Sequence, residues 1–285
     1  MSKFKAKYFE RNDSWSKIIS TYLILSFFSL ITIFPILNLL TVAFKPGAGT
    51  FVADFSGFIQ NFGITNFRDA FAMNLGIWIK NSLIISTMTA IIGVTVSITA
   101  AYAFSRFQFW GKRVGIMSFL LTQMFPAPML LLPMNLILMK LNLMNSFYGL
   151  LIPYIATVVP FSVWMLKGYF DTIPKSLEES AYIDGCNLVQ ALFKIVLPLS
   201  LPALAITTLY SFMQAWSEYV IASVILRDPN MITLPVGLVS FVSSFGGMWG
   251  VYAASAVITS FPVMLLFMFL SKYLVGDLTS GGSKE

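Results

Sequence analysis

Long stretches without a single charged residue constrain this chain more than any other feature. Four of them, residues 18–44, 81–105, 114–139 and 141–166, contain no Asp, Glu, Lys or Arg. A helix needs about 20 apolar residues to cross the hydrocarbon core of a bilayer, and a charge at its centre costs a few kcal/mol. Each stretch is therefore predicted to cross a membrane once.

Two further spans follow in the carboxyl-terminal third. Residues 201–226 contain one ionisable residue, Glu218, and residues 229–271 contain none but are too long for one helix. Because a proline and several glycines interrupt its first part, we interpret residues 228–248 as an outer loop. We predict an all-α polytopic membrane protein with six transmembrane helices at residues 18–42, 81–104, 114–139, 147–166, 201–226 and 249–274.

Composition excludes an ordinary soluble enzyme. Only 11% of the 285 residues are charged and 57% are hydrophobic, whereas soluble domains carry about 25% charged residues. The chain has no histidine and one cysteine, Cys186. Disulfides, histidine bases and zinc motifs built from histidine or paired cysteines are therefore excluded.

The distribution of basic residues predicts the orientation. Lys and Arg accumulate on the cytoplasmic side of short loops. With the amino terminus inside, 13 of the 18 basic residues lie in the cytoplasm, and the five on the outside are Lys45, Arg68, Lys80, Lys140 and Arg227. We expect cytoplasmic tails at residues 1–17 and 276–285 around a permease domain at 18–275. These basic residues are dispersed, so the membrane lipid, and no nucleic acid, is the expected partner.

The cytoplasmic segment between the fourth and fifth predicted spans contains a short helix. Ser176 and Glu179 have the spacing of a capping box, which predicts a helix from Leu177. Gly185 can adopt the positive φ of a helix end. A helix of about eight residues, about 12 Å long, is expected.

A second helix is predicted directly after this glycine. Asn187 and Gln190 form another capping-box pattern, and Pro198 and Pro202 are expected to bend the chain toward the fifth span. Two capped helices joined at a glycine exceed what a simple connector needs. This architecture predicts a docking surface.

The same residues resemble a known motif. Glu179-Ser180-Ala181, Gly185 four residues later, and Ile195-x-Leu197-Pro198 after nine further residues resemble the EAA loop of ABC importer permeases, with Ser180 replacing the usual alanine. The segments 143–154, 216–219 and 275–282 are similar to permeases of carbohydrate importers of the maltose and maltodextrin type. The resemblance therefore covers most of the chain.

This resemblance implies the type I importer permease fold in a bacterial cytoplasmic (inner) membrane, and it implies alternating access. The partners would be a second homologous permease, two ATP-binding subunits and an extracytoplasmic sugar-binding protein. ATP and Mg²⁺ would bind to the partner ATPases, since this chain lacks a phosphate-binding G-x-x-x-x-G-K-[ST] motif and is not expected to be an enzyme. The implied ATPase-coupling loop, residues 170–198, contains Glu178, Glu179, Ser180, Ala181, Asp184, Gly185, Ile195, Leu197 and Pro198.

Several alternatives stay open at this stage. Glu179 could dock on an ATPase, cap its own helix, or do both, and Asp184 could dock or simply lie in solvent. A secondary transporter or channel working without ATP is the alternative function. An intramembrane enzyme would need a nucleophile and a base, for which the sequence offers no motif.

Polar and proline residues inside the predicted spans suggest the transport pathway or a subunit interface, while Glu218 could instead be a structural carboxylate satisfied by neighbouring helices. Glu218 would lie roughly 12 Å below the outer end of the fifth span, with Gln214 one turn earlier on the same face and available for hydrogen bonding. Pro126, Pro128 and Pro133 must disturb the third span and could either line the route or only fix a kink.

The outer loop offers a contact for a binding protein. By resemblance, the region around 239–250 reaches that partner. Its flexible, small residues are the candidates: Ser243, Ser244, Gly246 and Gly247.

Overall fold

The computed structural model describes residues 15–47, 62–243 and 247–280, without the side chains of residues 127–128 and 274–280. These residues form helices and no strands. Four helices are long and apolar enough to cross a membrane: α1 (Trp15–Phe44), α4 (Leu75–Arg106), α7 (Phe147–Thr172) and α14 (Trp249–Ser280). They contain the first, second, fourth and sixth predicted spans.

The predicted third span, residues 114–139, is not one continuous helix, and the disturbance expected from its prolines is confirmed at Pro126. This span consists of α5 (Lys112–Thr122) and α6 (Ala127–Lys140), which are separated by a turn that ends at Pro126. Pro126 has an extended backbone with φ −59° and ψ 129°. A proline here cannot donate the helical hydrogen bond, and its ring excludes the preceding turn from a regular helix. Pro133, in contrast, lies within α6.

The predicted fifth helix, residues 201–226, is also interrupted. Helix α11 (Leu201–Ser217) ends before Glu218, which has an extended backbone, and α12 (Val220–Ile225) follows. Before α11, α9 (Leu188–Ala191), a π-helical turn (Leu192–Val196) and α10 (Leu197–Leu199) form a segment bent by 83° from α11. The two prolines at Pro198 and Pro202 lie at this bend, as the sequence predicts.

Two short helices belong to segments that the sequence assigned to loops. Helix α3 (Thr65–Ala72) precedes α4, and α13 (Leu234–Ser243) lies within the predicted outer loop 228–248. The Ser82 hydroxyl accepts the backbone N–H of Leu234 at 2.7 Å and so satisfies a donor of the first turn of α13. Part of the predicted outer loop is therefore a packed helix.

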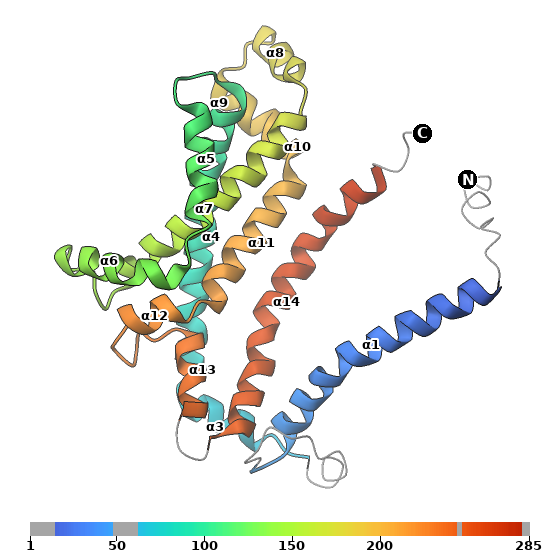
Figure 1. Cartoon of the computed structure of the whole chain (residues 1–285), viewed down its shortest axis with the longest axis vertical. Helices are drawn as coiled ribbons and strands as arrows, with labels where there is room; N and C mark the ends of the chain where they lie inside the picture. Colours follow the sequence, from blue (N-terminus) through green and yellow to red (C-terminus); the bar gives the residue numbers. More distant parts are fainter. Residues whose placement is uncertain (1–14, 48–61, 244–246, 281–285) are drawn as a thin grey trace.

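The core lies where α4 packs against α7 and α11 (Figure 1). Small residues on α4 allow this close approach, and a Cβ atom built on Gly93 would lie only 2.8 Å from a methyl of Val158. Buried serines and threonines share this face of α4, namely Ser82, Ser86, Thr89 and Ser97. Small residues at a helix interface let backbones approach, which drives helix association in membranes.

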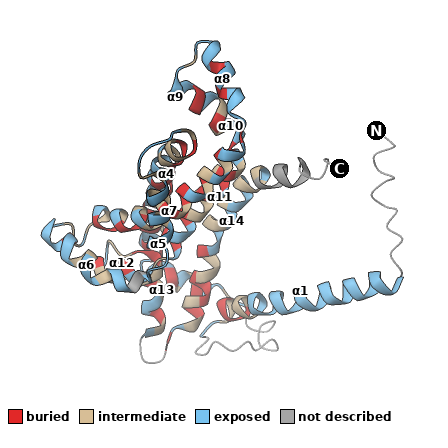
Figure 2. Cartoon of the chain, turned by 45° about the horizontal axis from the view of Figure 1, so that its top comes forward, coloured by how far each residue is buried: buried red, intermediate tan, exposed pale blue. Residues whose placement is uncertain are grey.

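Helix α1 lies apart from this bundle and is exposed along most of its length (Figure 2). Its buried residues are Thr41, Val42 and Ala43, at the end that meets α14 and α3. The Asn66 side chain donates to the carbonyls of Ala43 and Lys45 at 2.9 and 2.8 Å. It thereby satisfies acceptors that the end of α1 would otherwise leave open.

Candidate coupling segment and membrane cavity

Helix α8 (Lys175–Ile183) lies at one end of the bundle, beyond α9 and α10 (Figure 1). It begins at Lys175, two residues earlier than predicted, after Pro174 with φ −58° and ψ 129°. The predicted capping box of Ser176 and Glu179 is wrong, because both residues already lie inside the helix. The Ser180 hydroxyl instead donates to the Ser176 carbonyl at 2.9 Å.

The end of α8 confirms the prediction for Gly185. Its φ is +85°, a left-handed conformation that favours glycine. The N–H of Cys186 donates to the Ala181 carbonyl at 2.9 Å, which closes the end of the helix. The Asn187 and Gln190 capping box is also confirmed, with both reciprocal hydrogen bonds present at 2.8 and 2.9 Å. The junction of the two helices is therefore well defined.

A buried ion pair attaches α8 to the long helices. Glu178 is 3% exposed, and its carboxylate accepts from Arg106 Nε at 2.5 Å and from the Tyr102 hydroxyl at 2.6 Å. Both partners belong to the last turns of α4. The guanidinium of Arg106 also donates to the carbonyls of Phe170 and Ile173, at 2.9 and 3.2 Å. One arginine thus joins α4, the end of α7 and α8.

A second pair supports the same junction. Asp171 accepts from the Ser105 hydroxyl at 2.7 Å and from Lys167 at 2.6 Å. Because Ser105 precedes Arg106, the last turn of α4 meets the end of α7 through two adjacent residues. We infer that α8 moves with α4 and α7 as one unit.

The outer surface of α8 and α9 is left open to a partner. Glu179, Ser180, Asp184 and Gly185 are exposed. Apolar side chains lie beside them, and Ile183 is 87% exposed. The other large exposed apolar residues of this surface are Leu177, Tyr182, Leu188, Val189 and Phe193. An exposed apolar surface with acidic groups is typical of a protein contact.

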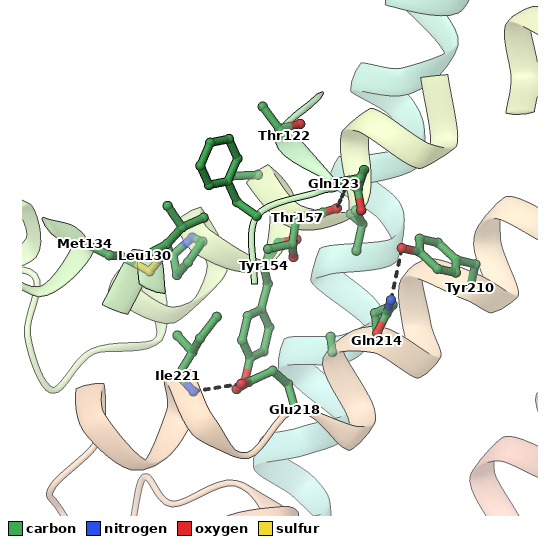
Figure 3. Close-up of a pocket in the computed structure, with 15 residues that line it drawn as sticks. Thr122, Gln123, Leu130, Met134, Tyr154, Thr157, Tyr210, Gln214, Glu218 and Ile221 are labelled. Carbon is green, nitrogen blue, oxygen red and sulfur yellow. Dashed lines mark hydrogen bonds between the residues drawn. The ribbon is translucent and has the colours of Figure 1, made fainter. Parts of the chain in front are cut away.

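A cavity of about 370 Å³ lies between the two interrupted helices (Figure 3). Its walls come from the α5–α6 junction, from α7 and from α11 and α12. The polar lining consists of Thr122, Gln123, Tyr154, Thr157, Tyr210, Gln214 and Glu218. Polar groups at an interrupted helix are typical of transport sites, where irregular backbone lines a cavity.

Glu218 occupies the break between α11 and α12. Its carboxylate accepts the backbone N–H groups of Ile221 and Ala222, at 2.7 and 3.0 Å, and the Tyr154 hydroxyl at 2.7 Å (Figure 3). It therefore caps α12 and joins it to α7. The expected hydrogen bond between Gln214 and Glu218 is not formed, because the Gln214 side chain is directed to Tyr210 instead. The Gln214 amide donates to the Tyr210 hydroxyl at 3.0 Å.

Comparisons with known proteins place these features in a family. The model of the "binding-protein-dependent transport system inner membrane component" family matches residues 93–279, which include α8 and the whole cavity lining. The chain belongs to this family. The match begins inside α4 and ends in α14, so it also includes the Arg106–Glu178 pair.

Curated relatives of the permease match along nearly the whole chain. This chain is 35% identical to the maltodextrin transport system permease protein MdxG of Bacillus subtilis, over 93% of this chain and 96% of the relative. It is 34% identical to the galactooligosaccharides transport system permease protein GanQ of the same organism, over 94% and 96%. It is also 33% identical to the maltose/maltodextrin transport system permease protein MalG of Vibrio vulnificus, over 94% and 96%.

A solved structure shares the fold. A chain of a bacterial ABC transporter involved in the import of the acidic polysaccharide alginate superposes with a TM-score of 0.77 and 25% identity, covering 92% of this permease and 98% of that chain. The expected importer permease fold is thus confirmed. The helix count differs from the six predicted, since four to five elements of the described residues qualify as spans by length and composition.

The remaining predicted residues are distributed over these regions. Ile195 and Leu197 are half-buried and Pro198 is exposed, directly after the π-helical turn. Pro198 has no N–H for the Lys194 carbonyl, which accounts for the wide turn there. Ser243 is exposed at the end of α13 and Gly247 is buried. Ser244 and Gly246 lie outside the described residues, as does the side chain of Pro128.

Sequence reasoning missed the partners of buried Glu178 and of half-buried Glu218. Arg106 entered the sequence analysis only as one of the 13 basic residues expected in the cytoplasm, and Tyr154 only as part of the segment 143–154. Tyr102 had no assigned role. The available signal was the position of Arg106 at the inner end of a predicted span, on the same side as the acidic segment that contains Glu178.

Proposed function

We propose that this permease is the membrane-spanning subunit of an ABC importer that carries a neutral oligosaccharide of the maltodextrin type into a bacterial cell. The names of its relatives support a sugar, since they include maltodextrin and galactooligosaccharide permeases. Relatives of similar identity differ in substrate, so maltodextrin is one member of the proposed class. Energy comes from ATP hydrolysis in two partner subunits, which bind ATP and Mg²⁺.

One observation supports the mechanism most directly: one side of α8 is attached to α4 by a buried ion pair, and the opposite side is exposed. The buried Arg106–Glu178 pair holds the helix to α4, and the exposed apolar surface around Ile183 remains for an ATPase. A force applied to such a helix passes to α4 and α7, because no slack linker intervenes. Closure of the ATPase subunits would then reorient the spans.

The partners follow from this role. A homologous permease completes the translocation pathway, and an extracytoplasmic sugar-binding protein delivers the substrate near the end of α13, where Ser243 is exposed. The segment around α8 then lies in the cytoplasm together with both termini. The permease itself performs no chemistry and alternates between inward-facing and outward-facing states.

The test uses the assembled importer with its binding protein in vesicles. Ile183 is 87% exposed, so Ile183→Asp leaves the fold of the chain intact and places a charge on the docking surface. Uptake of sugar and sugar-stimulated ATP hydrolysis should both fall at least tenfold, whereas the matched Ile183→Leu variant should keep both. Equal activity of the two variants would overturn the docking role.

A further inference from the structure

The cavity described above offers neutral hydrogen-bonding groups that the fold does not consume. The Gln123 amide donates to the Thr157 carbonyl at 3.1 Å, and the Gln214 amide donates to the Tyr210 hydroxyl. Within the described part of the chain, the carboxamide oxygens of Gln123 and Gln214 accept no hydrogen bond. Two acceptors and the remaining amide hydrogens are therefore free for a ligand.

The same cavity contains an aromatic surface. Tyr210 is half-buried, and its ring packs 4.3 Å from that of Phe161, measured between centroids. Phe161 thereby supports Tyr210 in a fixed position, with its hydroxyl beside Gln214 (Figure 3). A rigid ring next to amide groups is suited to a ligand with both apolar C–H faces and hydroxyl groups.

The charge of the lining restricts the ligand further. Among the lining residues, which the structure describes in full, none is Lys or Arg, and the one ionisable carboxylate is Glu218. Its oxygens already accept three hydrogen bonds from Tyr154 and α12. A uronic acid would bring a second negative charge close to this carboxylate without a cation to balance it, which is costly in a membrane interior.

We propose that this permease binds the translocated sugar itself, at a half-site made by Gln123, Tyr210 and Gln214, and that the half-site selects uncharged saccharide rings over acidic ones. The inference rests on the proposed function and adds direct substrate contact by this subunit. The two amides hydrogen-bond sugar hydroxyl groups, and Tyr210 packs against a ring face. Glu218 excludes acidic sugars and holds the wall in place.

The first test separates sugar movement from ATP turnover in the assembled importer. Gln214→Leu removes the carboxamide, including its free oxygen, at nearly constant volume. Met213→Leu changes the neighbouring exposed residue of α11, which lies outside the cavity lining. Loss of one or two hydrogen bonds to the sugar should lower the sugar moved per ATP hydrolysed about tenfold in Gln214→Leu. Met213→Leu should match the wild type. An unchanged ratio in Gln214→Leu would overturn the proposal.

The second test measures occupancy at the same position. The chain has one cysteine, Cys186, so a Cys186→Ser background makes Gln214→Cys the only thiol of this subunit. A maleimide should label this thiol in the complete importer, provided that the partner subunits contain no cysteine. Maltoheptaose with its binding protein and ATP should slow labelling severalfold, whereas an alginate oligosaccharide should not.

The outcomes distinguish a failure of the sugar half-site from a failure of the proposed transport function. Absence of labelling under all conditions would mean that a partner side chain fills the cavity and would refute the half-site. Labelling that neither sugar slows would refute it as well, and equal protection by both sugars would refute the charge selectivity. If the wild-type importer moved no sugar at all, the proposed function would fail instead.

Discussion

Removing Arg106 should release α8 from the membrane helices. Glu178 and Arg106 have side chains that are 4% and 8% exposed, so neither is solvated well by water. Arg106→Met leaves the Glu178 carboxylate with the Tyr102 hydroxyl as its one remaining described partner. Breaking one side of a buried pair costs about 3–5 kcal/mol. The population of the docked position of α8 relative to undocked ones should therefore fall about 150- to 4,000-fold.

Hydrogen exchange of the amides of α8, measured in the purified importer, follows this undocking directly. Arg106→Met should speed exchange across residues 175–183 and leave the core of α4 and α7 unchanged. The matched double variant Arg106→Met with Glu178→Met removes both charges at similar volume, so it should recover most of the protection.

The ATPase assay gives an independent measurement of the same change. Stimulation by the binding protein should disappear in Arg106→Met and return in part in the double variant. If Arg106→Met kept the exchange pattern of the wild type, the ion pair would not position α8, and the rigid attachment inferred here would be wrong.

Three further changes test local features. Gly185 has a φ of +85°, so Gly185→Ala should lower the free energy of unfolding by about 1–2 kcal/mol. Gly185→Asn should lower it less, because asparagine tolerates this conformation, and thermal unfolding compares the two variants. Glu218→Gln should lower stability by about 1–3 kcal/mol, since an amide group satisfies fewer of the three donors, and Tyr154→Phe should lower it less; equal losses would contradict the capping role. Gly93→Val should weaken the contact of α4 with Val158 by about 1–3 kcal/mol, whereas Ile92→Val on the exposed side should be neutral in the same assay.

The sequence predicted the long helices well because their boundaries follow from hydrophobic length and from charged ends. Arg106 ends α4 in the structure as it ends the uncharged stretch in the sequence. Gly185 and Asn187 were also predictable, since their roles depend on local backbone chemistry alone. Ser176 shows the limit of such patterns, because Pro174 starts α8 earlier and places the serine inside the helix.

The break between α11 and α12 was less accessible to sequence reasoning than the break at Pro126. The Glu218 carboxylate accepts two local N–H groups of α12, but its third donor, Tyr154, lies 64 residues away in the sequence. The Arg106–Glu178 pair likewise joins residues 72 positions apart. Such contacts form only when the bundle has assembled, so a single sequence indicates the groups but not their pairing.

We propose that this permease couples a membrane pathway to energy supplied by other subunits. Uptake of radiolabelled maltodextrin from the external medium tests this dependence directly. One set of vesicles contains the purified permease alone, and a second set contains the complete importer. Uphill accumulation should occur only in the complete importer, with ATP inside and the binding protein outside. Accumulation against a gradient by the permease alone would contradict the account.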